Sequence, residues 1–117
     1  MTSKKVATVS GVIALPSKTR LPSDAIAYIT LVDVTPRQDS SGGIIARQTL
    51  NHPTSETIAF KLDYDSAKIC ADCLYAIQVQ IVTQGKVIYR NASAYPVITR
   101  GKPTIVNVML KPVQRVE

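Results

Sequence analysis

The sequence predicts an all-β protein: an antiparallel β-sandwich of about seven strands, immunoglobulin-like or transthyretin-like in general architecture. Hydrophobic residues make up 45% of the 117 positions, yet there is no Trp and only one Phe. The core must therefore consist mainly of Val, Ile, Leu and Ala, and β-branched residues favour half-buried, pleated surfaces. Apolar and polar residues also alternate with a period of two within short segments, and turn-forming residues lie between these segments.

Seven segments are predicted as strands because each combines this alternation with turn residues at its ends. They are residues 6–15, 25–34, 44–50, 57–62, 74–82, 87–95 and 104–111. Short strands, regular turns and the lack of a convincing long helix together favour a sandwich.

The first two segments each have one apolar face. In residues 6–15, Val9, Ile13 and Leu15 fall on the same side under a period of two. Two prolines in the loop that follows argue against a helix there. In residues 25–34, apolar residues alternate with Tyr and Thr until a Thr-Pro pair ends the strand.

The third and fourth segments are reached through polar loops. The loop at residues 37–43 ends in Ser-Ser-Gly-Gly, and its length predicts a crossing between sheets rather than a tight hairpin. In residues 57–62, apolar and polar side chains alternate again. Residues 63–68 are then predicted to make one helical turn, with the Asp65 carboxylate as its cap.

The last three segments have the clearest patterns. In residues 74–82, Tyr75 and three β-branched residues alternate with Ala and Gln, and Thr-Gln-Gly-Lys then predicts a hairpin turn. Residues 87–95 end in a Tyr-Pro corner. Gly101 permits a strained turn conformation before residues 104–111, which again place alternate apolar residues inward.

Residues 6–112 are predicted to form a single β-sandwich domain, since no repeat or low-complexity segment marks a second one. Residues 1–5 are predicted to be a disordered N-terminal segment and 113–117 a flexible tail, because neither has much to bury. No apolar run approaches the roughly 20 residues that cross a bilayer. Because a signal peptide and a lipidation cysteine are also absent, we expect either a cytoplasmic protein or one whose export segment is not in this sequence.

The net charge of +6 is unevenly distributed along the chain. Residues 1–72 carry eight Lys or Arg against seven Asp or Glu, whereas residues 73–117 carry six against one. If the last strands are neighbours, a basic strip on them could steer acidic partners or anionic headgroups towards the protein. The alternative is an ordinary solubilising charge. The residues predicted to form the strip are Lys86, Arg90, Arg100 and Lys102.

The sequence offers no catalytic site, cofactor site or metal site. His52 is the only histidine, and it lies in a polar loop without a patterned nucleophile or carboxylate beside it. The pair Asp63 and Asp65 lacks the Gly and the bidentate Glu of a calcium loop. We therefore predict that the protein is not an enzyme.

Cys70 and Cys73 form a CxxC motif with three alternative interpretations. The motif precedes a strand and no second pair exists, which is not the context of a thioredoxin-like redox motif or a zinc site. In an oxidising compartment the pair could close a local disulfide that contributes about 2 kcal/mol. Inert thiols are the second interpretation, and a redox or metal site is the third.

Nucleic-acid binding is not predicted, although the sequence pI is about 9.6. Stacking platforms interleave exposed aromatic residues with Lys or Arg. Tyr75 instead falls in register with the core positions of its strand, so it does not fit such a platform.

The chain resembles the YbaY/YscW family of small bacterial lipoproteins over nearly its whole length. The segments that carry the resemblance are Val9-Ser10-Gly11, residues 27–35 (Ala-Tyr-Ile-Thr-Leu-Val-Asp-Val-Thr), Ile45-Ala46-Arg47-Gln48, Phe60-x-Leu62-x-Tyr64-Asp65, Leu74-Tyr75-Ala76-Ile77 and residues 94–101 (Ala-Tyr-Pro-Val-Ile-Thr-Arg-Gly). The lipobox cysteine is absent from this sequence, and the Cys70/Cys73 pair is not part of the family pattern.

The resemblance implies a β-sandwich lipoprotein on the periplasmic side of the outer membrane, held in the inner leaflet of that membrane by a lipid anchor. One branch of the family serves as the pilotin of type III secretion systems. We therefore expect a non-enzymatic, pilotin-like chaperone that binds the C-terminal segment of a secretin, through a sheet edge or an apolar groove, and assists its outer-membrane targeting and assembly. The alternative is an envelope lipoprotein of the same family with a structural or membrane-surface role and no secretin partner.

Overall fold

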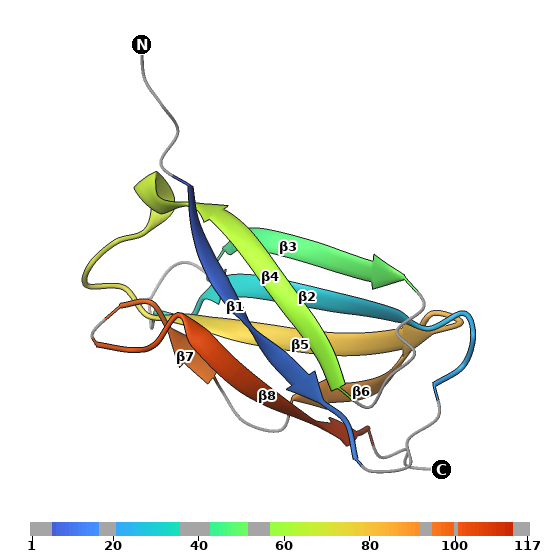
Figure 1. Ribbon diagram of the computed structural model, residues 1–117. Helices are drawn as coiled ribbons and strands as arrows, with labels where there is room; N and C mark the ends of the chain where they lie inside the picture. The colour runs from blue at the N-terminus through green and yellow to red at the C-terminus, as the bar shows by residue number, and fades with distance from the viewer. Residues whose placement is uncertain are drawn as a thin grey trace.

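The computed structural model describes residues 6–16, 21–35, 43–51, 57–91, 95–99 and 101–113. Within these ranges the strands and one 3₁₀ turn are β1 (Val6–Ala14), β2 (Ile26–Asp33), β3 (Ile44–Asn51), β4 (Thr57–Asp65), η1 (Ser66–Lys68), β5 (Tyr75–Thr83), β6 (Lys86–Asn91), β7 (Tyr95–Val97) and β8 (Ile105–Pro112) (Figure 1). The all-β prediction is confirmed. Each predicted segment overlaps a strand. The sixth, residues 87–95, covers most of β6 and reaches only the first residue of β7, which was not predicted as a separate strand.

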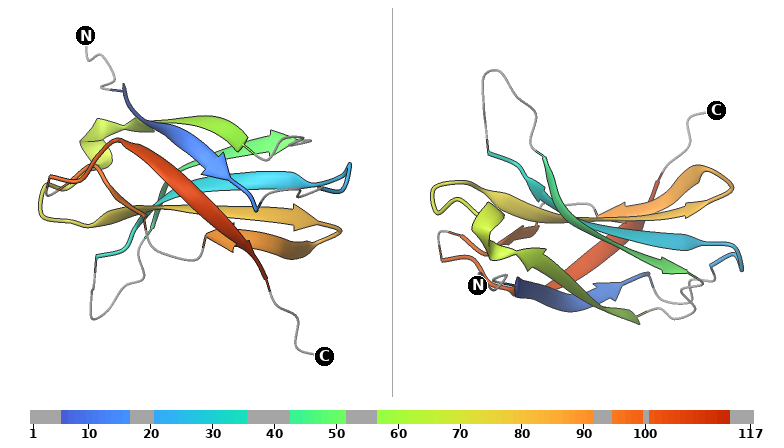
Figure 2. Two further views of the ribbon diagram at one scale, coloured as in Figure 1. Left: turned by 60° about the horizontal axis from the view of Figure 1, so that its bottom comes forward. Right: turned by 90° about the horizontal axis from the view of Figure 1, so that it is seen from above.

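The hydrogen-bonded order of the strands is β3-β2-β5-β6-β8-β1-β4, with β7 beside β5. β8 belongs to both layers of the molecule. Its first residues pair in parallel with β1, starting with Ser10 opposite Ile105. Its last residues pair antiparallel with β6, where Asn91 lies opposite Leu110. The two layers therefore continue into one another, and the sandwich has a nearly closed, barrel-like form in which β8 runs obliquely past the other strands (Figure 2).

The parallel β1–β8 pair is the one departure from the antiparallel pattern among the recorded pairings. A short turn between two strands forces them to run in opposite directions. β1 and β8 lie near opposite ends of the sequence, so no such turn connects them.

The prediction that residues 37–43 carry the chain from one sheet to another is wrong. β2 and β3 are antiparallel neighbours in the same sheet, with Ile26 opposite Asn51. A long connection can join adjacent strands as well as distant ones, so loop length alone did not identify the partner strand. Residues 36–42 lie outside the described ranges.

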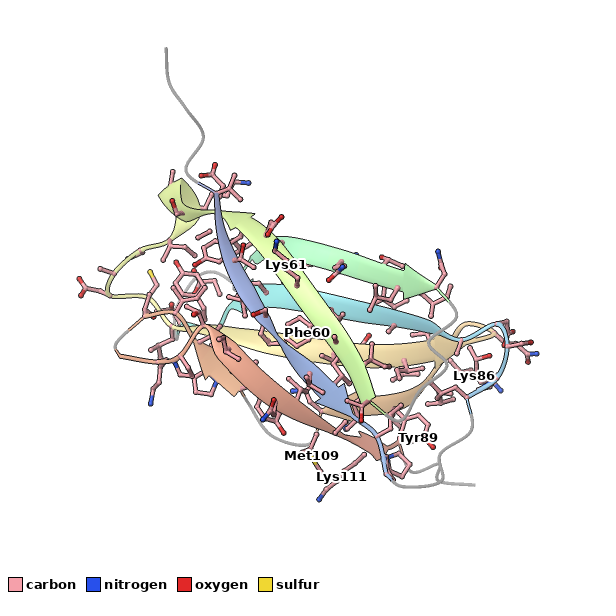
Figure 3. All side chains as sticks on the ribbon, in the orientation of Figure 1. Phe60, Lys61, Lys86, Tyr89, Met109 and Lys111 are labelled. Carbon is pink, nitrogen blue, oxygen red and sulfur yellow. The ribbon has the colours of Figure 1, made fainter. Side chains whose placement is uncertain are left out.

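The core lies between the two layers. Its largest fully buried side chains are Tyr75, Ile13, Ile29, Leu31, Ile77, Ile81, Val9, Val79, Val97 and Val108. Phe60 extends from β4 into the same space, whereas the neighbouring Lys61 is exposed (Figure 3). Because the side-chain period of a strand is two, a slip of one residue would expose each strand's buried set, and the core therefore fixes the register.

Two aspartates hold the ends of strands, as expected for turn-forming carboxylates. Asp65 Oδ1 accepts a hydrogen bond from Ala67 N–H at 2.9 Å, which confirms its predicted role as the cap of η1. Asp33 Oδ1 accepts hydrogen bonds from the Thr35 backbone N–H and hydroxyl. The Thr35 hydroxyl oxygen in turn accepts from Leu74 N–H at 2.8 Å, so the end of β2 is tied to the start of β5.

Gly11 permits the close approach of β1 and β8. A Cβ atom at this position would lie 1.8 Å from the carbonyl oxygen of Val106, the residue opposite it in the parallel pair. No L side chain fits such a space, and a backbone carbonyl cannot move away without breaking the pairing. Gly is therefore required here by packing against the neighbouring backbone.

We predict that Gly11→Ala lowers the free energy of unfolding by about 3 kcal/mol or more, because β8 must separate from β1 to accommodate the methyl group. Gly43→Ala is the matched control: a Cβ at Gly43 meets nothing within 4 Å, so a change within about 0.5 kcal/mol is expected. Chemical denaturation of both variants measures this difference. Equal stability of the two variants would contradict the proposed close approach.

Candidate functional site

Two connections meet at one end of the sandwich. One runs from η1 through residues 69–74 into β5, and the other runs from β7 through Gly101 into β8, at the left of Figure 1. They are neighbours because Tyr75, at the start of β5, pairs with Val97, at the end of β7. The sequence therefore brings together two loops that lie more than twenty residues apart along the chain.

Tyr75 anchors the first of these loops from inside the core. Its side chain is only 2% exposed. The hydroxyl oxygen accepts a hydrogen bond from Cys70 N–H at 2.8 Å, and the hydroxyl donates to the Lys68 carbonyl at 3.5 Å. Burial raises the pKa of Tyr75 above its usual value, while the hydrogen bond from Cys70 acts in the opposite direction.

Thr99 ties the second loop to the first. Its hydroxyl is buried and donates a 2.6 Å hydrogen bond to the Cys73 carbonyl. Thr99 N–H donates to the Val97 carbonyl at 2.9 Å, and the Thr99 carbonyl accepts from Lys102 N–H at 3.1 Å. The two loops consequently form one hydrogen-bonded unit.

Ile98 adopts a strained backbone conformation at the centre of this unit. Its φ is +76°, and the Thr99-to-Val97 hydrogen bond across it closes a γ-turn. A positive φ is unfavourable for a β-branched residue. Ile98 N–H also donates to the Pro103 carbonyl at 3.0 Å, so hydrogen bonds on both sides hold the residue in place. The prediction for Gly101 is confirmed, since its φ is also +76°.

A cavity of about 390 Å³ opens between the two loops. Four of its lining residues, Tyr64, Ile69, Ala71 and Ile98, supply mainly apolar surface, and Ser66 and Thr99 supply hydroxyl groups. The titratable side chain among the described lining residues is Tyr64, whose pKa is raised by burial. This lining suits the binding of an apolar group.

The predicted basic strip is not one continuous surface. Lys86 pairs with Thr83 at the β5–β6 hairpin, whereas Lys102 follows β7, which pairs with the start of β5. From Tyr75 to Thr83 β5 spans eight residue steps, or about 27 Å at about 3.4 Å per step. Lys86 and Lys102 therefore lie at opposite ends of the molecule.

The remaining members of the strip have different positions. Arg90 lies opposite Lys111 on β8, and both are exposed. Lys111 was not included in the predicted strip, although the outward position that alternation gives it in β8 could have identified it (Figure 3). Arg100 lies outside the described residues. The steering role of the strip stays a prediction.

A second surface with exposed apolar side chains lies on the outer face of β4, β1 and β8. Ile105 is 69% exposed and Met109 is 55% exposed, both on β8 (Figure 3 labels Met109). Ala14 on β1 lies opposite Met109, whereas Ser10 lies opposite Ile105. Val12 on β1 lies between the polar Asn107 on β8 and Ala59 on β4. This surface is a second place where an apolar partner could be accommodated.

The cysteines lie in the turn between η1 and β5, with Cys70 exposed and Cys73 buried. In the structure the two cysteines are thiols and are not joined by a disulfide. The Cys73 N–H donates a 3.0 Å hydrogen bond to the Cys70 carbonyl. A turn of this kind brings its end Cα atoms within about 7 Å, close to the range that a disulfide spans.

The described residues contain no group of three or more His, Cys, Asp or Glu that could hold a metal ion. Nor do they contain a helix long and apolar enough to span a membrane.

We predict that Cys70 and Cys73 form a disulfide under oxidising conditions. Thiol titration of denatured, unreduced protein should then find fewer than about 0.2 thiols per chain, and reduction should restore both, since closing a short loop adds about 2 kcal/mol to stability. Cys70→Ser is the control, because it leaves Cys73 titratable. Two reactive thiols per unreduced chain would contradict the disulfide.

We predict that Tyr75→Phe costs about 1–2 kcal/mol at pH 8, because Cys70 N–H loses its acceptor. The difference from the parent protein should shrink above about pH 10. In that range the unfolded tyrosine loses its proton while the folded one, with its raised pKa, keeps it, so the contribution of Tyr75 to stability falls as the pH rises. Urea denaturation at pH 8 and at higher pH measures the effect. A pH-independent difference would rule out this account.

Comparison with known proteins identifies the family. The family model described as "Type III secretion system lipoprotein chaperone (YscW)" matches residues 4–110. A solved structure of an alternative pilotin from the type II secretion system of Vibrio cholerae matches with a TM-score of 0.83 and 30% sequence identity, covering 95% of this chain and 100% of that chain. No curated protein matches the chain. The family and the fold point to a non-enzymatic role. The chain belongs to the family of type III secretion system lipoprotein chaperones, YscW.

Proposed function

We propose that this protein is a pilotin-like chaperone that binds the C-terminal segment of a type III secretion secretin and assists the targeting and assembly of that secretin in the outer membrane. The observation that carries the proposal is the family match, which extends over residues 4–110. The similarity to a type II pilotin supports it, because the match covers the whole of that chain.

The architecture agrees with a binding role. The cavity between the η1 loop and the β7–β8 loop has a mainly apolar lining, and the outer face of β4, β1 and β8 exposes Ile105 and Met109. Either surface can accept a short apolar segment of a partner, and neither requires a cofactor. In this proposal a lipid anchor holds the domain at the periplasmic side of the outer membrane, as the term lipoprotein in the family description implies.

The family description names type III secretion, whereas the solved relative comes from a type II system. Both are secretion systems, so the two comparisons agree on the general role, that of a secretion-system chaperone. We propose the type III secretin as the partner because the family model matches the chain over nearly its full length.

The test is calorimetric titration of the protein with peptides that cover the C-terminal segment of the type III secretin from the same organism. We expect saturable, one-to-one binding that a scrambled peptide of the same composition does not reproduce. A peptide from a type II secretin of that organism, if it has one, provides the comparison between systems. Absence of binding to every secretin peptide by folded protein would favour an envelope lipoprotein without a secretin partner.

A further inference from the structure

We propose that Cys70 and Cys73 form a thiol–disulfide exchange site, and that closing their disulfide orders the β7–β8 loop through Thr99. In this site Cys70 reacts first with an external disulfide, and Cys73 then closes the internal bond. The disulfide predicted above is the product, whereas the order of the two steps and the response of the loop are additional. Neither requires a secretin partner, so the exchange site is independent of the proposed function.

The two sulfurs differ in their access to solvent. Cys70 is exposed, whereas Cys73 is buried, with 7% of its surface exposed. The rate of thiol–disulfide exchange depends on access to the attacking thiol, and an external disulfide is bulky. Cys70 is therefore the sulfur that an external disulfide reaches, and Cys73 is placed to react within the chain.

The backbone turn holds the two cysteines at a separation that suits the internal bond. Cys73 N–H donates a 3.0 Å hydrogen bond to the Cys70 carbonyl. The two Cα atoms consequently lie at the ends of a four-residue turn, within about 7 Å of each other. A disulfide spans Cα separations of roughly 4.4–6.8 Å, so the internal bond forms with little movement of the backbone.

The oxidant in this reaction is a disulfide of a small thiol or of an oxidoreductase. The Cys70 thiolate attacks one sulfur of that disulfide, whose S–S bond breaks, and one thiol of the oxidant leaves. The Cys73 thiolate then attacks the Cys70 sulfur of the mixed disulfide, and the second thiol leaves. Two protein thiols are thereby oxidised to one disulfide, one external disulfide is reduced to two thiols, and the two cysteine protons end on those thiols.

Two hydroxyl groups hold the ends of the turn. The Tyr75 hydroxyl oxygen accepts a 2.8 Å hydrogen bond from Cys70 N–H, and the Thr99 hydroxyl donates a 2.6 Å hydrogen bond to the Cys73 carbonyl. Burial is the main cause of the raised pKa of Tyr75, and a hydrogen bond with the Cys73 side chain raises this pKa further. Oxidation of Cys73 therefore changes a group that Tyr75 contacts, next to the point where Thr99 is attached.

The Cys73 carbonyl connects the exchange site to the β7–β8 loop. A disulfide adds a covalent link to the turn and so restricts the orientations of this carbonyl, and a group that is already ordered costs less entropy to bind. The backbone of Thr99 is in turn bonded to Val97 and Lys102. Oxidation should therefore order the loop that carries Ile98 and Thr99, which form part of the cavity wall.

The order of the two steps is tested with two single variants in the reduced, folded state. Cys73→Ser retains Cys70 and should form a mixed disulfide with glutathione disulfide at least about tenfold faster than Cys70→Ser, which retains Cys73. Mass spectrometry of acid-quenched samples measures both rates. In guanidinium chloride the two rates should be similar, because unfolding exposes both sulfurs. Equal rates in the folded variants, or faster reaction at Cys73, would overturn the assignment of Cys70.

Amide hydrogen exchange followed by NMR, in the reduced and the oxidised protein, tests the response of the loop. Oxidation should slow exchange of the Ile98 and Lys102 amides, which donate to the Pro103 and Thr99 carbonyls, by about fivefold or more. The amides of the β5–β6 hairpin, at the other end of β5, should not respond. Unchanged exchange at Ile98 and Lys102 in the oxidised parent protein would overturn the coupling, and so would a parent protein that stops at the mixed disulfide.

Coupling between two sites is reciprocal, so the Thr99 hydroxyl must also favour the disulfide. In glutathione redox buffers, Thr99→Val should lower the equilibrium constant for oxidation by about fivefold or more, and Thr99→Ser, which keeps a hydroxyl, should restore most of it. Thr83→Val is the matched control. Its hydroxyl donates to Asp24 at the other end of β5, so a change of less than about twofold is expected.

Thermal denaturation checks that each threonine variant is folded. An unchanged oxidation equilibrium in folded Thr99→Val, or an equal change in Thr83→Val, would overturn the role of Thr99. If Thr99→Val does not fold, the comparison of Thr99→Ser with Thr83→Val and the loop exchange of the parent protein still decide the question. A secretin peptide enters none of these measurements, so their failure and the failure of the proposed function are distinguishable.

Discussion

The sharing of β8 between the two layers is the constraint on which the rest of the structure depends. Its first residues pair with β1 and its last residues with β6, so a single strand fixes the position of one layer relative to the other. This arrangement requires that β1 approach β8 closely, and Gly11 makes that approach compatible with the Val106 carbonyl. The buried residues of β8, such as Val108, then close the core against the other layer.

The sequence was sufficient to predict the local features of the fold. Alternation with a period of two located every strand except β7, whose three residues are too few for a periodic pattern. The cap at Asp65 and the positive φ of Gly101 also followed from residue type, since a carboxylate before a helical turn and a glycine in a tight turn have specific chemical roles.

The features that could not be predicted depend on contacts between distant residues. The neighbour of β3 and the direction of β8 relative to β1 are set by packing in three dimensions, which a local pattern does not encode. Residue type also argued against the positive φ of Ile98, because it is β-branched; surrounding hydrogen bonds override that preference. The basic strip combined Lys86 and Lys102 on the expectation that the last strands are neighbours, whereas the length of β5 separates these two residues.

The candidate site shows how hydrogen bonds from buried side chains shape a surface cavity. Tyr75 anchors the first loop from the buried side and Thr99 ties the second loop to it, and Ala71 and Ile98 lie at the wall of the cavity. The parallel pairing of β1 and β8 has a further consequence for how the chain folds. It joins strands from the two ends of the sequence, and contacts of such long range form slowly because a large loop must close first. A chain synthesised from its N-terminus thus leaves β1 without this partner until β8 has emerged, so the domain cannot complete its fold until the last strand is available.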